Sequence, residues 1–178
     1  MITLTLPEPV ITDEITLKLT GMVYYGNPIH TYEGWDIQNE IGKLWKRFTE
    51  VCIRNAEIIE KHATEPNVAY EAHIANPDQP DQEYHVLVGF KTNTPITTPI
   101  EFFFKEMPTT RYAVFTGKGK DMPAQMEKIY TEWLPNSPYT ESYPMLIQRY
   151  DQTRFKELDD PESEIDFMVP IKEREDEG

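Results

Sequence analysis

The amino-acid sequence predicts an α+β fold: duplicated strand–helix–strand–strand (β-α-β-β) units forming one antiparallel sheet, with two helices on one face and a central ligand groove. Three observations lead to this prediction. Two segments carry apolar residues at helical spacing. Short β-branched and aromatic runs lie between turn-forming residues. The order of these segments repeats once along a chain of 178 residues, the size of one domain. We therefore expect residues 1–178 to form a single domain, with a groove where its halves meet.

The first half is predicted to contain three strands and one helix. Residues 14–25 are rich in β-branched and aromatic side chains, and the turn formers Gly26, Asn27 and Pro28 follow them. Residues 68–75 and 83–91 are typical of two strands joined as a hairpin. Between the first strand and this hairpin we expect a helix with Asp36 as its N-cap, because apolar residues recur at spacings of three, four and seven. These residues are Ile37, Ile41, Leu44, Trp45, Phe48, Val51, Cys52 and Ile59.

The second half repeats this order. Strands are expected at residues 100–105 and 111–116, and the closing strands at 145–150 and 165–171. The helix between them is predicted to be capped by Asp121 and stopped by Pro135, with one apolar face made of Met122, Met126, Ile129, Tyr130, Trp133 and Leu134.

The chain carries a formal net charge of −14, with a sequence pI of about 4.7. This balance argues against direct nucleic-acid binding, because phosphate contacts draw their affinity from clustered Lys and Arg. A single cysteine, Cys52, fits a reducing compartment and is expected to be a buried structural thiol. The N-terminus lacks the pattern of a signal peptide, and no apolar run is long enough to span a membrane. We expect a cytoplasmic protein.

No motif in the sequence indicates a catalytic residue, a metal ligand or a cofactor. The segment Gly117–Lys120 matches neither phosphate-loop pattern, so we expect a strand-to-helix turn with a glycine at positive φ. His73 and His85 could face one another across the hairpin, but two histidines without a third ligand do not predict a zinc site. Nucleophile signatures such as G-x-S-x-G are absent from the sequence.

Aromatic residues are placed on or beside nearly every predicted element. A tyrosine offers a π face and one polar group, which suits a flat or cationic ligand. Each ring taken singly is also explained by core packing. The residues concerned are Tyr24, Tyr25, Trp35, Trp45, Tyr84, Tyr112, Tyr130, Trp133 and Tyr150.

One segment carries a family resemblance. Residues 111–139 read RYAVFTGKGKDMPAQMEKIYTEWLPNSPY, and this segment resembles the GyrI-like family of bacterial transcription activator effector-binding domains. Corroborating segments follow the same order: IGKLWKRF (41–48), EYHVLVGF (83–90), MLIQRYD (145–151) and IDFMVPI (165–171). The resemblance covers a core of roughly 14–172, and an acidic tail at 173–178 follows it.

The resemblance implies the duplicated fold reached above and several possible activities. Members of the family act as drug-sensing domains of regulators, as free-standing binding proteins and, in some branches, as hydrolases of strained toxins. Many members carry an acidic residue, then any residue, then a tyrosine after the W-L-P sequence, whereas this chain has Gln148, Arg149 and Tyr150. Glutamine offers only a dipole to a cation. Glu71 or Glu83 could supply the missing charge.

The preferred function is therefore a stand-alone small-molecule binding protein that acts in sensing or sequestration of an aromatic or cationic, drug-like ligand. One alternative is a hydrolase of strained electrophilic toxins on the same fold, and a second is a protein-interaction inhibitor of the DNA gyrase inhibitor type. The sequence favours binding over catalysis. The predicted ligand-binding residues are Tyr24, Trp45, Tyr84, Tyr112, Gln148 and Tyr150.

Overall fold

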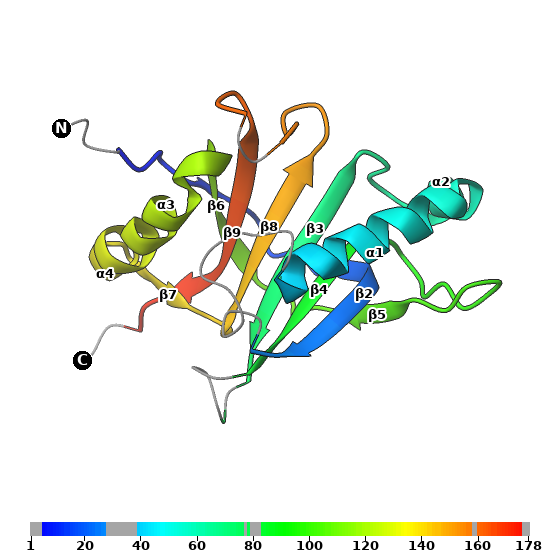
Figure 1. Ribbon diagram of the computed structural model, residues 1–178. Helices are drawn as coiled ribbons and strands as arrows, with labels where there is room; N and C mark the ends of the chain where they lie inside the picture. The colour runs from blue at the N-terminus through cyan, green and yellow to red at the C-terminus, as the bar shows by residue number, and fades with distance from the viewer. Residues whose placement is uncertain (1–4, 28–38, 77, 79–82, 158–159, 176–178) are drawn as a thin grey trace. The chain divides into compact units, whose positions relative to one another are not determined.

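The computed structural model describes residues 5–27, 39–76, 78, 83–157 and 160–175. These residues form two compact units (Figure 1). One unit lies within residues 16–108, and the other combines residues up to 15 with residues from 109 onward. We call them the 16–108 unit and the 109–178 unit and describe each by itself.

The 16–108 unit is an antiparallel sheet with strand order β3-β4-β2-β5. Helix α1 packs on β2 and β4, and it crosses in front of the strands of this unit in Figure 1. The elements are β2 (Lys18–Gly26), α1 (Glu40–Arg54), α2 (Ala56–His62), β3 (Val68–Ala75), β4 (Tyr84–Lys91) and β5 (Phe103–Glu106).

The 109–178 unit is also antiparallel, with strand order β1-β6-β9-β8, and β7 pairs with the end of β9. Its helical segment packs on β6. The elements are β1 (Val10–Ile11), β6 (Arg111–Lys118), η1 (Gly119–Asp121), α3 (Met122–Lys128), η2 (Ile129–Trp133), α4 (Leu134–Asn136), β7 (Tyr139–Glu141), β8 (Met145–Asp151) and β9 (Glu164–Glu173).

Both units repeat one topology, which confirms the predicted α+β class and its duplication. In each unit the last strand of the repeat lies between the other two: β4 between β3 and β2, and β9 between β8 and β6. The helical segment joins the first strand to the second. A ligand groove where the halves meet stays a prediction.

The first helix begins later and ends earlier than the sequence indicated. Asn39 is its N-cap, since its side chain accepts a hydrogen bond from the Gly42 amide at 2.7 Å. The predicted cap, Asp36, lies outside the described residues. The helix then breaks at Asn55, whose side-chain amide donates to the carbonyl of Val51 at 2.7 Å and competes with helix continuation. A second short helix, α2, follows.

The second helical segment is also irregular. Its middle turn, Ile129–Trp133, is a π-helix, and Pro135 lies inside the last turn instead of ending the helix before it. A proline inside a helix removes one backbone hydrogen bond, in agreement with the end of the helical segment one residue later at Asn136. Asp121 precedes α3 but makes no side-chain capping hydrogen bond.

The predicted glycine turn after β6 is wrong. Strand β6 continues to Lys118, and the glycine at positive φ among the described residues is Gly26. Gly117 is needed for a different reason, because a Cβ there would lie 1.8 Å from Oε1 of the buried Gln125. The glycine therefore permits the close approach of α3 to the strand.

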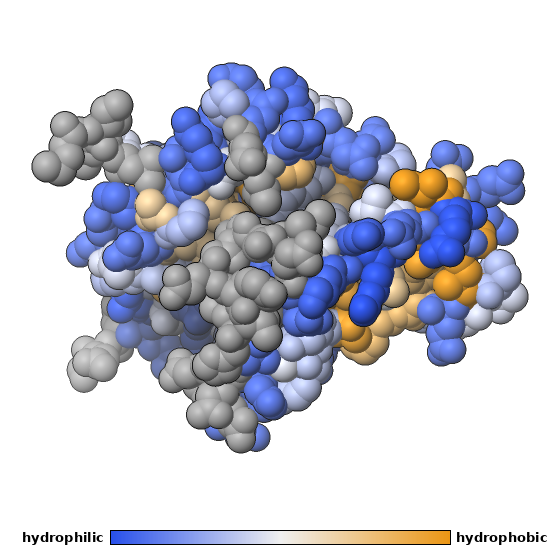
Figure 2. All heavy atoms as spheres, in the orientation of Figure 1, coloured by the Kyte–Doolittle hydropathy of each residue, from blue (hydrophilic) through white to orange (hydrophobic). Residues whose placement is uncertain are grey.

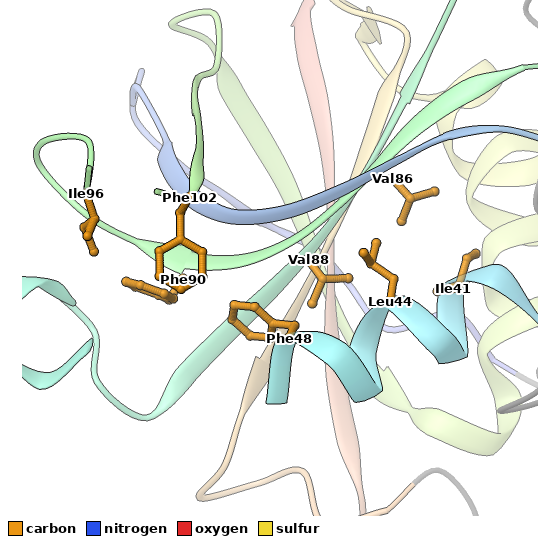
Figure 3. Packing of buried hydrophobic residues seen from close by; sticks show 8 residues of the cluster. All are labelled: Ile41, Leu44, Phe48, Val86, Val88, Phe90, Ile96 and Phe102. Carbon is orange, nitrogen blue, oxygen red and sulfur yellow. The ribbon is translucent and has the colours of Figure 1, made fainter. Parts of the chain in front are cut away.

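The core of the 16–108 unit forms where α1 meets β4 (Figure 3). Ile41, Leu44 and Phe48 lie at spacings of three and four on one helical face, and they pack against alternate residues of β4. The buried cluster contains Ile41, Leu44, Phe48, Val86, Val88, Phe90, Ile96 and Phe102. Its rings meet partly edge to face, as in the Phe90–Phe102 pair with centroids 6.0 Å apart.

Cys52 packs against this cluster and is partly buried, not fully buried as expected. Burial raises the pKa of its thiol to about 11. The thiol therefore stays protonated at neutral pH and is a poor nucleophile.

Hydrophobic side chains also reach the surface of this unit. Figure 2 shows them gathered over α1, α2 and β5 on the face in view. Ile53 of α1 and Phe103 of β5 are exposed. The net charge of −14 is thus accompanied by an apolar surface region.

Strands β2 and β4 approach closely where Gly21 pairs with Gly89. A Cβ on Gly21 would lie 2.0 Å from the carbonyl oxygen of Val88, which is backbone and cannot rotate away. We expect Gly21→Ala to lower the free energy of unfolding by about 2 kcal/mol or more, because the strands must separate. Urea unfolding followed by circular dichroism measures this loss.

Gly117→Ala is the matched comparison, because the added methyl group meets a side chain there. The double variant Gly117→Ala with Gln125→Ala should recover part of the stability that Gly117→Ala loses. A Gly21→Ala protein as stable as the wild type would contradict this account of the glycine pair.

Candidate ligand-binding site

The strand register decides which side chains face α1. Val86 and Val88 of β4 belong to the cluster beneath α1. Glu71 of β3 pairs with Val88, and His73 pairs with Val86. Paired residues of neighbouring strands point to the same face of a sheet. Glu71 and His73 therefore face the helix, and they are neighbours on that face because they are two residues apart.

Glu71 is the centre of this face. It is 0% exposed, and both of its carboxylate oxygens accept hydrogen bonds. Trp45 of α1 donates its Nε1 hydrogen to Oε2, and the Nε2 atom of His73 lies 2.6 Å from Oε1. A buried carboxylate is costly unless it is paired in this way. The indole of Trp45 thus holds the helix and the strand together at a charged group.

Two tyrosines complete the group. The ring of Tyr84 stacks on His73 with centroids 5.6 Å apart and an interplanar angle of 30°. Burial raises the pKa of Tyr84 to about 12, and the negative charge of Glu71 and the nearby Tyr24 add to the rise. Trp45, Tyr84 and Tyr24 are all partly exposed. We call Glu71, Trp45, His73, Tyr84 and Tyr24 the Glu71 cluster.

The side chain of Tyr24 lies along its own strand towards Gly26. A Cβ on Gly26 would lie 2.7 Å from the Tyr24 hydroxyl oxygen, and Gly26 has a φ of +146°. Only glycine adopts that conformation without strain and leaves room for the phenol. The three predicted residues Tyr24, Trp45 and Tyr84 are thus brought together, and their role in ligand binding stays a prediction.

The predicted pair Gln148 and Tyr150 lies on β8 of the 109–178 unit. Both side chains are buried, and the hydroxyl of Tyr150 donates to Oε1 of Gln148 at 2.5 Å. The ring of Tyr150 also meets Phe155 edge to face, with centroids 5.0 Å apart. The glutamine carbonyl is therefore satisfied within the protein.

Tyr112 is not brought together with that pair. It pairs with Pro170 of β9, whereas Gln148 pairs with Phe167 three residues earlier on the same strand. Residues an odd number apart on a strand point to opposite faces, so Tyr112 lies on the other face of the sheet. Its buried hydroxyl has no hydrogen-bond partner among the residues that the structure describes. Burial raises its pKa, and Tyr143 contributes further.

Sequence reasoning left Glu71 undecided and missed the role of His73. His85 pairs with Ile74, so the two histidines lie on opposite faces and do not face one another as expected. Glu83 is exposed and precedes β4, so Glu71 is the buried one of the two carboxylates considered. The alternation Glu71–Ala72–His73 in a predicted strand was the signal, because it places the acid and the imidazole on one face.

The 109–178 unit has an open groove of about 730 Å³. The rings of Trp133 and Tyr139 stack there with centroids 6.1 Å apart. None of the six predicted ligand-binding residues lines this groove. Its lining residues include Pro7, Pro9, Lys128, Glu132, Trp133 and Tyr139. Within the described ranges, no helix is both long and apolar enough to cross a membrane.

Known proteins with similar sequences or folds agree with this architecture. The chain is 30% identical over 164 residues to the transcriptional regulator BrlR of Pseudomonas aeruginosa strain PAO1. That match covers 90% of this chain and 54% of BrlR, so the chain spans about half the length of this curated relative.

Solved structures share the fold at low sequence identity. SAV2435 bound to tetraphenylphosphonium has a TM-score of 0.67 at 13% identity, over 93% of this chain and 94% of that one. An integron cassette protein from the mobile metagenome of Vibrio cholerae has a TM-score of 0.59 at 14% identity, over 94% and 97% of the two chains.

The resemblance to GyrI-like effector-binding domains is confirmed by a match to a family of this kind. The matching family is Cass2, described as integron-associated effector binding protein, and the match runs over residues 12–171. Because it spans most of the sequence, this chain belongs to the Cass2 family of integron-associated effector-binding proteins.

Proposed function

We propose that this protein binds a small aromatic cation at the Glu71 cluster and acts in sensing or sequestration of that ligand. The observation that carries the proposal is the carboxylate of Glu71, which is 0% exposed and is surrounded by the partly exposed rings of Trp45, Tyr84 and His73. A charge in such surroundings attracts a cation far more strongly than a surface carboxylate does.

Cation–π attraction, the carboxylate charge and the net charge of the protein all favour a cation with aromatic groups. Each well-placed ring contributes about 0.5–2 kcal/mol of cation–π attraction. The carboxylate supplies the charge that Gln148 lacks, so the acid is provided by β3 instead of β8. The net charge of −14 raises the local concentration of cations around the protein.

The comparisons support the ligand class and the regulatory setting. Tetraphenylphosphonium, the ligand of SAV2435, is an aromatic cation, and SAV2435 shares the fold. BrlR is named a transcriptional regulator, which favours sensing as the use of the bound ligand. Sensing and sequestration both require a small-molecule ligand. Sensing also requires a protein partner that responds to the bound state, whereas sequestration does not.

Tetraphenylphosphonium is expected to bind the protein, and Glu71→Gln is expected to weaken binding about tenfold or more, which is about 1.4 kcal/mol. The amide keeps the shape of the carboxylate and removes its charge. Isothermal titration calorimetry measures both affinities. Glu83→Gln removes an equal charge from an exposed position and should leave the affinity within about twofold of the wild type.

Tetraphenylborate is the matched ligand control, since it has nearly the same shape and the opposite charge. A thermal-shift assay should show stabilisation by the cation and none by the anion, with neutral triphenylphosphine oxide in between. Equal stabilisation by both ions would contradict a site organised around a carboxylate.

The alternative centre is the Gln148–Tyr150 pair of the other unit. Gln148→Ala and Tyr150→Phe are expected to reduce the tetraphenylphosphonium affinity less than Glu71→Gln does, because a neutral amide stabilises a cation only through its dipole. The same calorimetry decides the order. A larger loss from Gln148→Ala than from Glu71→Gln would move the site to β8.

The charge on Glu71 can be tested without a ligand. Since that charge contributes to the raised pKa of Tyr84, Glu71→Gln should lower this pKa from about 12 while burial keeps it above the value of a free phenol. Nuclear magnetic resonance of ring-labelled tyrosine, with the Tyr84 resonance assigned, follows this titration. Glu83→Gln should leave the Tyr84 titration in place, and an unchanged pKa in Glu71→Gln would argue that Glu71 is uncharged.

A further inference from the structure

The hydrogen bond between His73 and Glu71 fixes where each proton of the imidazole lies. The Nε2 atom of His73 is 2.6 Å from Oε1 of Glu71, and an ionised carboxylate only accepts hydrogen bonds. Nε2 therefore carries a hydrogen, and the next proton adds at Nδ1. The side chain of His73 is 21% exposed, so the imidazole is in contact with solvent.

Protonation of His73 changes the charge that a ligand meets. With a neutral imidazole, Glu71 leaves the pair with one net negative charge. With an imidazolium, the pair is a salt bridge of zero net charge, since Glu71 is already neutralised. An organic cation would then meet a like charge within a few ångströms, which disfavours binding.

We propose that His73 is an internal competitor of the ligand for Glu71, so that binding of an organic cation is coupled to release of one proton from Nδ1 of His73. This inference rests on the proposed function. By linkage, ligand and proton each weaken the binding of the other by the same factor. The protein would therefore hold its ligand less tightly as the pH falls.

Other groups that face His73 do not titrate near neutral pH. From β4 comes Tyr84, whose raised pKa of about 12 keeps it protonated. From β2 comes Tyr24, a phenol, which pairs with Val86 opposite His73. From α1 comes Trp45, which has no titrating group. Among these residues, an imidazole is the side chain whose charge ordinarily changes between pH 5 and 8, and His73 supplies it.

The sign of the pH dependence follows from this competition. Above the pH at which His73 is protonated in the free protein, the full affinity is present and no proton is released. Below it, the cation must displace a proton, so the affinity falls by up to about tenfold per pH unit. The number of protons released rises from zero towards one over the same range.

The test uses tetraphenylphosphonium, because this cation is permanent and cannot titrate. Calorimetric titrations from pH 5.5 to 8.5, each in two buffers of different ionisation enthalpy, give the dissociation constant and the number of protons released. His73→Gln is the key variant, since glutamine keeps an N–H donor for Glu71 and does not titrate. It should bind with an affinity that is nearly independent of pH and release no protons.

His85→Gln is the matched control. His85 lies on the same hairpin but on the opposite face, with its ring 4.5 Å from that of Tyr25. This variant should keep the pH dependence and the proton release of the wild type. If the loss of pH dependence appeared equally in His85→Gln, the proposal would be overturned.

Two measurements on the wild-type protein test the role of His73 even if His73→Gln folds poorly. Imidazole resonances of His73 should titrate at lower pH in the saturated protein than in the free protein. Binding without any proton release and without this shift would overturn the role of His73 while leaving the proposed function intact. Failure of the wild type to bind tetraphenylphosphonium at any pH would overturn both.

Discussion

The antiparallel register of β3, β4 and β2 is the constraint on which the candidate site depends. It places Glu71 beside Val88 and His73 beside Val86 on the face that α1 covers. A slip of one residue would turn both polar side chains away from the helix and bring Tyr70 and Ala72 towards it. The glycine pair Gly21 and Gly89 helps to fix this register, because only these two residues let the backbones approach so closely.

Placing a carboxylate beneath a helix costs stability, and the surrounding core offsets that cost. Trp45 and His73 occupy the two oxygens of Glu71, so the charge is hydrogen-bonded although it is shielded from water. One helical turn further along α1, Phe48 packs edge to face on Trp45, and it also meets Phe90 of β4. The same helix therefore anchors the hydrophobic cluster and supplies a donor to the charged one.

The two repeats use one topology for different chemistry. In each, one edge strand of the repeat, β3 or β8, carries a polar pair two residues apart on one face. The pair is Glu71 with His73 on β3, and Gln148 with Tyr150 on β8, and each pair is joined by a hydrogen bond of its own. One pair joins a carboxylate to an imidazole, and the other joins an amide to a phenol. The two halves of the duplicated fold thus differ in the chemistry of this pair, with a buried acid in one and a buried amide in the other.

Local patterns in the sequence determined the fold class, the strand at 68–75, the hairpin and the duplicated order, because periodicity and turn residues act over a few positions. They also brought Tyr24, Trp45 and Tyr84 forward as candidates. The sequence did not predict the helix break at Asn55 or the π-helical turn at Ile129–Trp133, because these features depend on single side chains and on packing. Only the tertiary structure decided that Glu71, and not Glu83, is buried, and that His73 turns to Glu71 instead of His85. The physical reason is that burial and pairing depend on register between distant segments, as the contact between Trp45 and Glu71 at a sequence separation of 26 illustrates.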